Sequence, residues 1–312
     1  MTAAPATGAD SYFGFVGVTT GSSSINAVFP RWADRLGLPT RTLRGHDVAL
    51  GASPETYRQL VDAIAGDPRH WGALVTTHKM ALYAAAADLF DELDELATTF
   101  AEVSSIAKRG QRLTGAAKDP ITVSLALDEF LPADHFSSTG AAALVLGSGG
   151  AGTALSHQLG RRTDRPVEVI CTALDPGALA HARQLHERAG IESDRMRYAL
   201  TRDSGAADVL LSSLPPASLV VNATGLGKDR PGSPLGATAG FPQRAVVWEF
   251  NYRGSLEFLH QARAQQIERE LVVEDGWRYF VHGWSQVIAD VFDLDMPAAT
   301  VADLSRIAAE AR

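Results

Sequence analysis

The amino-acid sequence predicts an α/β protein of two domains, a first α/β domain and a second, doubly wound domain, with C-terminal helices that pack back on the first. Strand-like and helix-like segments alternate through the first 130 residues, which is typical of helices layered on a mostly parallel sheet. A second alternation begins at the apolar and glycine-rich stretch 141–152. Between them lies LPADHFSSTG (131–140), rich in residues that break regular structure. We therefore expect domains over 1–137 and 138–272 and returning helices over 273–312.

Composition excludes several classes of protein. Of the 312 residues, 46% are hydrophobic and 21% charged, which fits a soluble globular protein with sizeable cores. The net charge of −8 argues against binding to nucleic acid or an anionic membrane. The single cysteine, Cys171, excludes a disulfide within the chain and a cysteine metal cluster, and we expect no metal. Without a run of about 18 apolar residues or a signal-like start over 1–10, we expect a cytoplasmic protein with no membrane span.

The first domain should contain three strands, a hairpin and five helices. Ser53, Pro54 and Glu55 illustrate the signals: a capping residue, a proline at the first helical position and an acid in the first turn. The expected strands are 12–18, 41–43 and 71–76, with a hairpin of 103–107 and 112–115. The expected helices are 26–36, 53–64, 79–89, 91–100 and 121–130.

The second domain should be a doubly wound sheet followed by two helices. Its expected strands are 141–146, 167–171, 196–200, 219–223 and 245–250. Its expected helices are 151–160, 177–189, 206–211 and 255–265, and the chain should end in helices 281–292 and 300–311.

The glycine-rich loop GSGGAG follows the first strand of that domain. Gly147, Gly149 and Gly152 occupy the three positions of the dinucleotide-binding fingerprint. Glycine allows the sharp turn and the close approach of a pyrophosphate, and the following helix would present free N–H groups to the phosphates. An ordinary strand–glycine–helix connection is the alternative.

Three polar groups follow strands in places where α/β proteins bind ligands. Lys79 comes just after strand 71–76, and Asp119 precedes helix 121–130. Paired, each would favour the charged form of the other and support proton transfer. A solvated lysine and a plain helix cap are the alternatives. The loop Asn222–Gly227, after strand 219–223, suits a nicotinamide or ribose, or it is simply a glycine-rich turn.

Together these motifs resemble those of the shikimate/quinate dehydrogenase family, in order and over nearly the whole chain. GSGGAG at Gly147–Gly152 resembles the family's GxGGAG, and NATGLGK at Asn222–Lys228 resembles NATPLGM. THK at Thr77–Lys79 resembles the end of NVTxPHK, and GAAKD at Gly115–Asp119 resembles GxNTD. WEFNYR at Trp248–Arg253 resembles the strand that ends in the family's DxxYxP motif.

The resemblance implies a first domain that binds a cyclohexane acid and a Rossmann domain that binds NAD(P). It also implies hydride transfer in which Lys79 exchanges the hydroxyl proton and Asp119 is its partner. The implied cofactor contacts are Gly147, Ser148, Gly149, Gly150, Ala151, Gly152, Thr172, Asp175, Asn222, Ala223, Thr224 and Gly225. The implied substrate contacts are Ser22, Ser23, Ser24, Ser104, Tyr252 and Gln286.

Several substrate positions depart from the family pattern. The N-terminal TTGSSSIN (19–26) lacks the spacing and proline of the family's serine motif. Val75 stands for the threonine of NVTxPHK, and Thr77 stands for its proline. Ser104 and Ala117 stand for two substrate-binding asparagines, and Lys118 adds a positive charge beside Asp119.

The C-terminal region departs as well. Gly283 stands for the glutamine of the family's MLVxQ motif, unless Gln286 replaces it one turn later. Trp277, Tyr279 and Trp284 are candidates to line a more apolar site, or else to pack the C-terminal helix onto the first domain.

These observations lead to one hypothesis and two alternatives. Because Val169–Ala182 contains no lysine or arginine for a 2′-phosphate, we expect NAD to bind at least as well as NADP. The hypothesis is an NAD(P)-dependent oxidoreductase acting on an alcohol or ketone of an altered cyclic or small polar substrate. The alternatives are a nucleotide- or metabolite-binding homologue without turnover, and a redox-neutral enzyme that reuses the Lys79 and Asp119 pair. The expected partners are a small-molecule substrate and a second copy in a homodimer.

Overall fold

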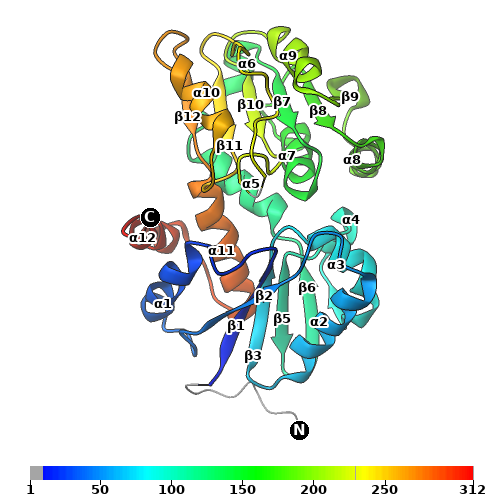
Figure 1. Ribbon diagram of the computed structural model, residues 1–312, viewed down its shortest axis with the longest axis vertical. Coiled ribbons are helices and arrows are strands. Elements are labelled where there is room, and N and C mark those ends of the chain that lie inside the picture. The colour runs from blue at the N-terminus through cyan, green and yellow to red at the C-terminus, as the bar shows by residue number, and fades with distance from the viewer. Residues whose placement is uncertain (1–9, 229, 312) are drawn as a thin grey trace. The chain divides into compact units, whose positions relative to one another are not determined.

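The computed structural model describes residues 10–228 and 230–311, which form two compact units (Figure 1). Unit 1 combines the residues up to Asp119 with those from Val281 onward, and unit 2 is Pro120–Phe280. The division falls within helices α5 (Asp119–Asp128) and α11 (Trp277–Phe292), not at the expected 137/138 and 272/273. The roles expected for the two domains stay predictions.

Unit 1 is built on a mixed sheet with the strand order β2-β1-β3-β5-β6-β4. The strands are β1 (Tyr12–Gly17), β2 (Leu43–Asp47), β3 (His70–Val75), β4 (Glu92–Leu93), β5 (Ser105–Arg109) and β6 (Arg112–Ala116). Strands β1, β2 and β3 are parallel, and β5 runs antiparallel to both β3 and β6. The helices are α1 (Ile25–Leu36), α2 (Pro54–Gly66), α3 (Lys79–Ala86), α4 (Glu95–Phe100) and α12 (Ala298–Ala309), with a short 3₁₀ turn at Ala87–Leu89.

Helices α2 and α3 bury apolar side chains against the unit 1 sheet. Val16 and Val75 of the sheet share a core with Val61 and Ile64 of α2 and Leu82 of α3. The spacing of three between Val61 and Ile64 places both side chains on one face of α2.

A second, aromatic core of unit 1 forms between β1 and the C-terminal part of α11. Trp284 contacts Phe13 and Phe15 edge-on, at centroid distances of 6.1 and 4.9 Å. Phe13 also packs on Phe29 of α1. Trp284 therefore packs the C-terminal helix onto this unit, the second of the two roles expected for the aromatic residues.

Unit 2 is a doubly wound sheet with all strands parallel, in the order β12-β11-β10-β7-β8-β9. The strands are β7 (Ala143–Leu146), β8 (Val169–Ala173), β9 (Met196–Leu200), β10 (Leu219–Asn222), β11 (Val246–Glu249) and β12 (Val272–Glu274). The helices are α5, α6 (His135–Thr139), α7 (Gly150–Arg161), α8 (Pro176–Arg188), α9 (Ser204–Ser212) and α10 (Glu257–Gln265), with a 3₁₀ turn at Ser193–Arg195. The expected α/β class is confirmed, and the chain order reverses between β7 and β10.

Four local expectations were wrong. The second strand is Leu43–Asp47, a largely exposed edge strand of sequence LRGHD that has no apolar alternation. Glu92–Leu93 pairs with β6 instead of starting a helix, because Asp94 caps α4 one residue later. Helix α6 forms inside the expected linker, and β12 was not expected.

Over the described residues, none of the helices combines the length and apolarity needed to cross a membrane.

Candidate functional site

One edge of the unit 1 sheet collects the polar groups expected to act on a substrate. Strands β1, β3 and β6 end at this edge, and the antiparallel β5 begins there. The loop 19–24 follows β1, Lys79 follows β3, Ser104 precedes β5 and Asp119 follows β6. The topology thus gathers residues separated by up to 100 positions in the sequence.

Lys79 and Asp119 form an ion pair at this edge. The Lys79 Nζ donates to both carboxylate oxygens of Asp119, at 2.5 Å for Oδ1. The two side chains are 17% and 7% exposed, so the pair is mostly buried but reachable from solvent through the lysine. Lys79 is fixed at the first position of α3, and its carbonyl oxygen accepts from Val103 N at 3.2 Å. The expected pairing of these residues is confirmed, and their catalytic roles stay predictions.

Glu102 is a charged neighbour of the pair that the sequence analysis missed. Its side chain is fully buried, and among the described residues neither carboxylate oxygen has a hydrogen-bond partner. Burial raises the pKa of Glu102 to about 8, with the negative charge of Asp119 adding to the rise and Lys79 opposing it. The available signal was a glutamate within the otherwise apolar FAEV at 100–103.

Lys118 does not offer a free positive charge beside the pair. Its Nζ lies 3.4 Å from Asp290 Oδ1 and 3.9 Å from Asp94 Oδ2. Asp290 belongs to α11 and also accepts from Ser105 Oγ at 2.6 Å. The charge added by Lys118 is therefore matched by carboxylates within unit 1.

The serines expected to bind substrate differ in their availability. The Ser104 hydroxyl is buried and accepts from Lys118 N at 2.6 Å, so it is already engaged by the backbone. Ser22 is exposed, Ser24 is half-buried and Ser23 is buried. Asn26 closes this loop, because its side-chain amide donates to the carbonyl oxygens of residues 20, 21 and 23.

The remaining candidates for substrate contact are divided between the two units. Gln286 is half-buried on α11. Tyr252 lies in unit 2, where its ring packs on Trp277 and Phe280. Tyr279 stacks on Phe250, also within unit 2. Whether any of these residues touches substrate stays a prediction.

The glycine-rich loop of unit 2 follows β7, at the point where the strand order reverses. Gly147 has a φ of 101°, and a Cβ there would lie 2.9 Å from the backbone of Ala223, in the loop after β10. A Cβ at Gly152 would overlap the carbonyl oxygen of Gly147. Gly149 caps α7 with open space around it. The three glycines of a dinucleotide-binding fingerprint allow a sharp turn, close packing and room for the phosphates, which correspond here to Gly147, Gly152 and Gly149.

Two of the expected cofactor contacts shape this loop through their own hydrogen bonds. The Ser148 hydroxyl donates to Thr172 O at 2.9 Å, and Gly147 N donates to Thr172 Oγ1 at 3.3 Å. Asp175 is exposed at the end of β8 and caps α8 by accepting from Ala178 N at 3.0 Å. Of the three, only Asp175 offers an exposed polar side chain.

Asn222 organises the second loop of unit 2 from inside. Its side-chain nitrogen donates to Glu249 Oε2 at 2.7 Å, and its oxygen accepts from the Thr224 hydroxyl at 2.7 Å. Burial raises the pKa of Glu249 to about 8, against the opposing hydrogen bonds from Asn251 and Asn222. With Asn222 fully buried, the half-buried Thr224 and Gly225 form the tip that faces outward.

The two loops of unit 2 fit a dinucleotide in both space and chemistry. The open position at Gly149 leaves room for a pyrophosphate, and α7 directs its first N–H groups there. Thr224 and Gly225 sit across the switch point, where doubly wound proteins hold the rest of such a ligand.

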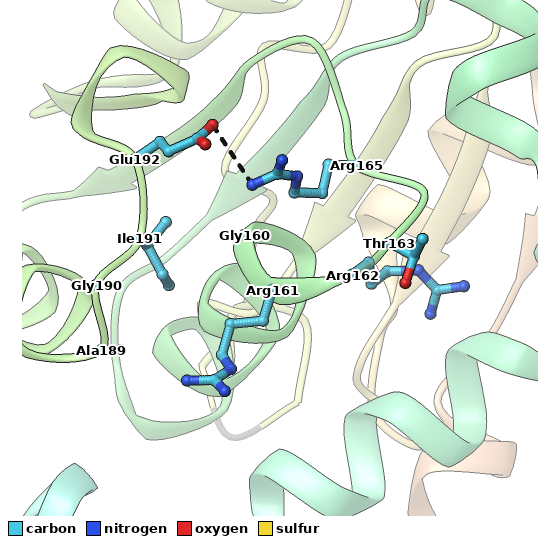
Figure 2. Close-up of a pocket in the computed structure, with 9 residues that line it drawn as sticks. All are labelled: Gly160, Arg161, Arg162, Thr163, Arg165, Ala189, Gly190, Ile191 and Glu192. Atoms are coloured by element: carbon cyan, nitrogen blue, oxygen red, sulfur yellow. Dashed lines mark ion pairs between the residues drawn. The ribbon is translucent and has the colours of Figure 1, made fainter.

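A pocket of about 470 Å³ lies elsewhere, at the C-terminal end of α7 (Figure 2). Arg165 in this pocket pairs with Glu192 at 3.4 Å, and Arg162 pairs with Asp128 at 2.6 Å. The 12 residues of α7 span about 18 Å between this end and the glycine loop. Arg161 and Arg162 are therefore poorly placed to meet a phosphate on a nucleotide bound at Gly149.

The chain is similar to known proteins in both sequence and fold. No protein-family model matches the chain. It is 29% identical over 225 residues to the shikimate dehydrogenase (NADP(+)) of Brucella abortus, an alignment covering 71% of this chain and 68% of that protein. The shikimate 5-dehydrogenase of Thermus thermophilus, solved with NADP(H) and shikimate, has a TM-score of 0.68 at 24% identity, over 96% of this chain and 99% of that one. The quinate dehydrogenase of Corynebacterium glutamicum, solved with NAD, has a TM-score of 0.70 at 20% identity, over 97% and 100%.

Proposed function

We propose that the chain is a divergent member of the shikimate/quinate dehydrogenase family and acts as an NAD(P)-dependent oxidoreductase on the CH–OH group of a cyclic or small polar substrate. The observation that carries this proposal is the mostly buried ion pair of Lys79 and Asp119 at a ligand-binding edge of the sheet. A nicotinamide bound in unit 2 would supply the hydride acceptor for oxidation and the hydride donor for reduction.

Lys79 handles the proton in this proposal. During oxidation, its amine takes the proton of the substrate hydroxyl as the carbon gives up hydride, and the C–O bond becomes C=O. During reduction, the ammonium returns that proton to the carbonyl oxygen. Asp119 holds Nζ in place and stabilises the ammonium form through its two oxygens.

Gly147–Gly152 and Asn222–Gly225 hold the dinucleotide in this proposal. The turn at Gly147 and the open position at Gly149 admit the pyrophosphate, which the first N–H groups of α7 then bind. Glu249 and Asn222 fix the loop at Thr224 and Gly225, which would face the nicotinamide end.

We further propose a substrate altered from shikimate and quinate. Val75 and Ala117 are fully buried apolar residues where the family pattern has polar ones, and the Ser104 hydroxyl is engaged by the backbone. A polyol in the usual pose would leave hydroxyl groups unpaired, at about 1–3 kcal/mol for each buried group. Two such losses weaken binding by roughly 30-fold to 10⁴-fold, because 1.4 kcal/mol corresponds to a factor of ten.

NAD is the cofactor that the residues of this chain favour. Arg183 lies over the Tyr198 ring at 4.8 Å, and Arg161 and Arg162 lie at the C-terminal end of α7, away from the glycine loop. The curated relatives carry NADP(+) in their names, which argues for the other cofactor. A homodimer and a cytoplasmic location stay predictions.

A nicotinamide absorbance assay over cyclitols and cyclohexane carboxylates, with each cofactor, tests this proposal. We expect turnover of at least one panel member and weak activity on shikimate and quinate. A kcat/KM of about 10⁴ M⁻¹s⁻¹ or more on either acid would overturn the altered-substrate proposal and leave the ordinary family activity. Tight NAD binding without turnover on any member would favour a binding homologue without dehydrogenase activity.

A further inference from the structure

Glu102 occupies a place where an ionised carboxylate is costly. It follows α4 immediately after Ala101, whose left-handed φ of 51° turns the chain, and the Glu102 amide donates to Ala97 O at 3.2 Å. The side chain is fully buried, and neither oxygen has a hydrogen-bond partner among the described residues. A buried charge without hydrogen bonds is strongly disfavoured, so the carboxyl group keeps its proton.

Three charged side chains act on Glu102 through their electrostatic fields. Lys79 of α3 and Asp119 at the start of α5 act on it directly, as does Asp94 in front of α4. Beyond Asp94 lies Lys118, which Asp290 of α11 also contacts. Each lysine therefore already has carboxylates against it, and an ionised Glu102 would add an uncompensated negative charge.

We propose that Glu102 is a positioning residue whose proton sets the charge state of the Lys79–Asp119 pair. With Glu102 neutral, Asp119 alone faces the lysine, and Lys79 can both take and release a proton. With Glu102 ionised, a second negative charge holds Lys79 in its ammonium form and slows the step in which it accepts the substrate proton. The expected effect on the reaction rate rests on the proposed function. The charge state of Glu102 does not depend on that function.

The first test follows the carboxyl group itself in the wild-type protein. Infrared difference spectra between about pH 6 and about pH 10 should show a carboxylic-acid C=O band disappear, because burial raises the pKa of Glu102 to about 8. Glu249, whose pKa burial also raises to about 8, contributes a second band of this kind, so Glu102→Gln should lose only part of the wild-type signal. Glu95→Gln, which removes an exposed glutamate of α4, should retain all of it. A wild-type spectrum without such a band, or a Glu102→Gln signal as large as that of the wild type, would overturn the proposal.

The second test follows Lys79. Competitive labelling with an amine reagent, read by mass spectrometry, measures the reactive unprotonated lysine without requiring turnover. At about pH 9, Lys79 should label faster in Glu102→Gln than in the wild type or Glu95→Gln, because the variant lacks a negative charge that opposes loss of the Lys79 proton. Equal labelling in all three proteins would overturn the proposal.

The third test links Glu102 to the reaction. With any substrate that is turned over, the rise of kcat/KM for alcohol oxidation should begin at lower pH in Glu102→Gln, while Glu95→Gln matches the wild type. Superimposable pH profiles would contradict the proposal. If no substrate is turned over, the proposed function fails, and the infrared and labelling results still decide the role of Glu102.

Discussion

The wild-type protein should become less stable as the pH rises, because the buried Glu102 must ionise. Replacing Glu102 by glutamine should abolish this pH-dependent contribution. The ordinary pKa of 4.5 applies to Glu102 in the unfolded chain, and burial raises it to about 8 in the folded protein. Between these values the folded state holds one proton more than the unfolded state. The free energy of unfolding therefore falls with rising pH, by about 1.4 kcal/mol per pH unit. Below the window both states are protonated, and above it neither is, so the contribution of Glu102 is constant outside it.

The magnitude follows directly from that slope. Over two pH units inside the window, the wild type should lose roughly 3 kcal/mol relative to Glu102→Gln, which cannot ionise. The full figure applies because the side chain is completely buried and is not screened by solvent.

Urea denaturation at constant ionic strength, repeated at several pH values, measures this difference. Every other ionisable group is shared, so subtracting the curves of wild type and variant isolates Glu102. Glu95→Gln should run parallel to the wild type, since that glutamate is exposed. Parallel curves for wild type and Glu102→Gln would mean that Glu102 is ionised in the folded protein, and the reasoning from its burial would be wrong.

Four further outcomes are expected. Gly152→Ala should lower stability by about 1–3 kcal/mol in urea titrations, because the new methyl group overlaps Gly147 O, whereas Gly149→Ala should fold normally and weaken dinucleotide binding in calorimetry. Calorimetric titration of the wild type should give NAD a Kd no higher than that of NADP, and a clear preference for NADP would refute that expectation. Trp284→Ala should cost about 3–5 kcal/mol of stability, since its ring packs on Phe13 and Phe15, and a loss below 1 kcal/mol would contradict that packing.

Local sequence signals predicted much of the fold. Strand β9 at Met196–Leu200 lies where it was expected, and most other elements agree within a few residues. Such agreement is expected where apolar periodicity and helix caps coincide, as at Ser53 and Pro54 of α2. Leu43–Asp47 was missed because an exposed edge strand buries few side chains and therefore needs no apolar pattern.

Site residues were predicted where a motif fixes them and missed where only packing does. The motifs located Lys79, Asp119 and the glycine loop. No motif marks Glu102, which is buried directly after the left-handed turn at Ala101. The partner of Lys118, Asp290, is far along the chain and joins it only through the fold of unit 1.

The sequence also did not show which hydrogen-bond partners the hydroxyl and amide side chains would have in the fold. Ser148, Thr172 and Asn222 were expected to meet a cofactor, and their side chains hold the two loops of unit 2 together. A sequence shows which groups can form hydrogen bonds, but the choice between the backbone and a ligand depends on distances that only the fold supplies.

The kcat of Lys79→Ala, measured on the best substrate of the panel, tests whether Lys79 is the general acid–base group of the reaction. We expect kcat to fall by about 10²–10⁴-fold, as is usual when such a group is removed. The Kd for NAD measured by calorimetry should be unchanged, because the dinucleotide loops belong to unit 2. Lys108→Ala is the matched control, since this half-buried lysine of unit 1 donates to the backbone oxygen of Asp67 and should leave kcat unchanged. A Lys79→Ala enzyme that keeps kcat within a few-fold of the wild type would contradict the account.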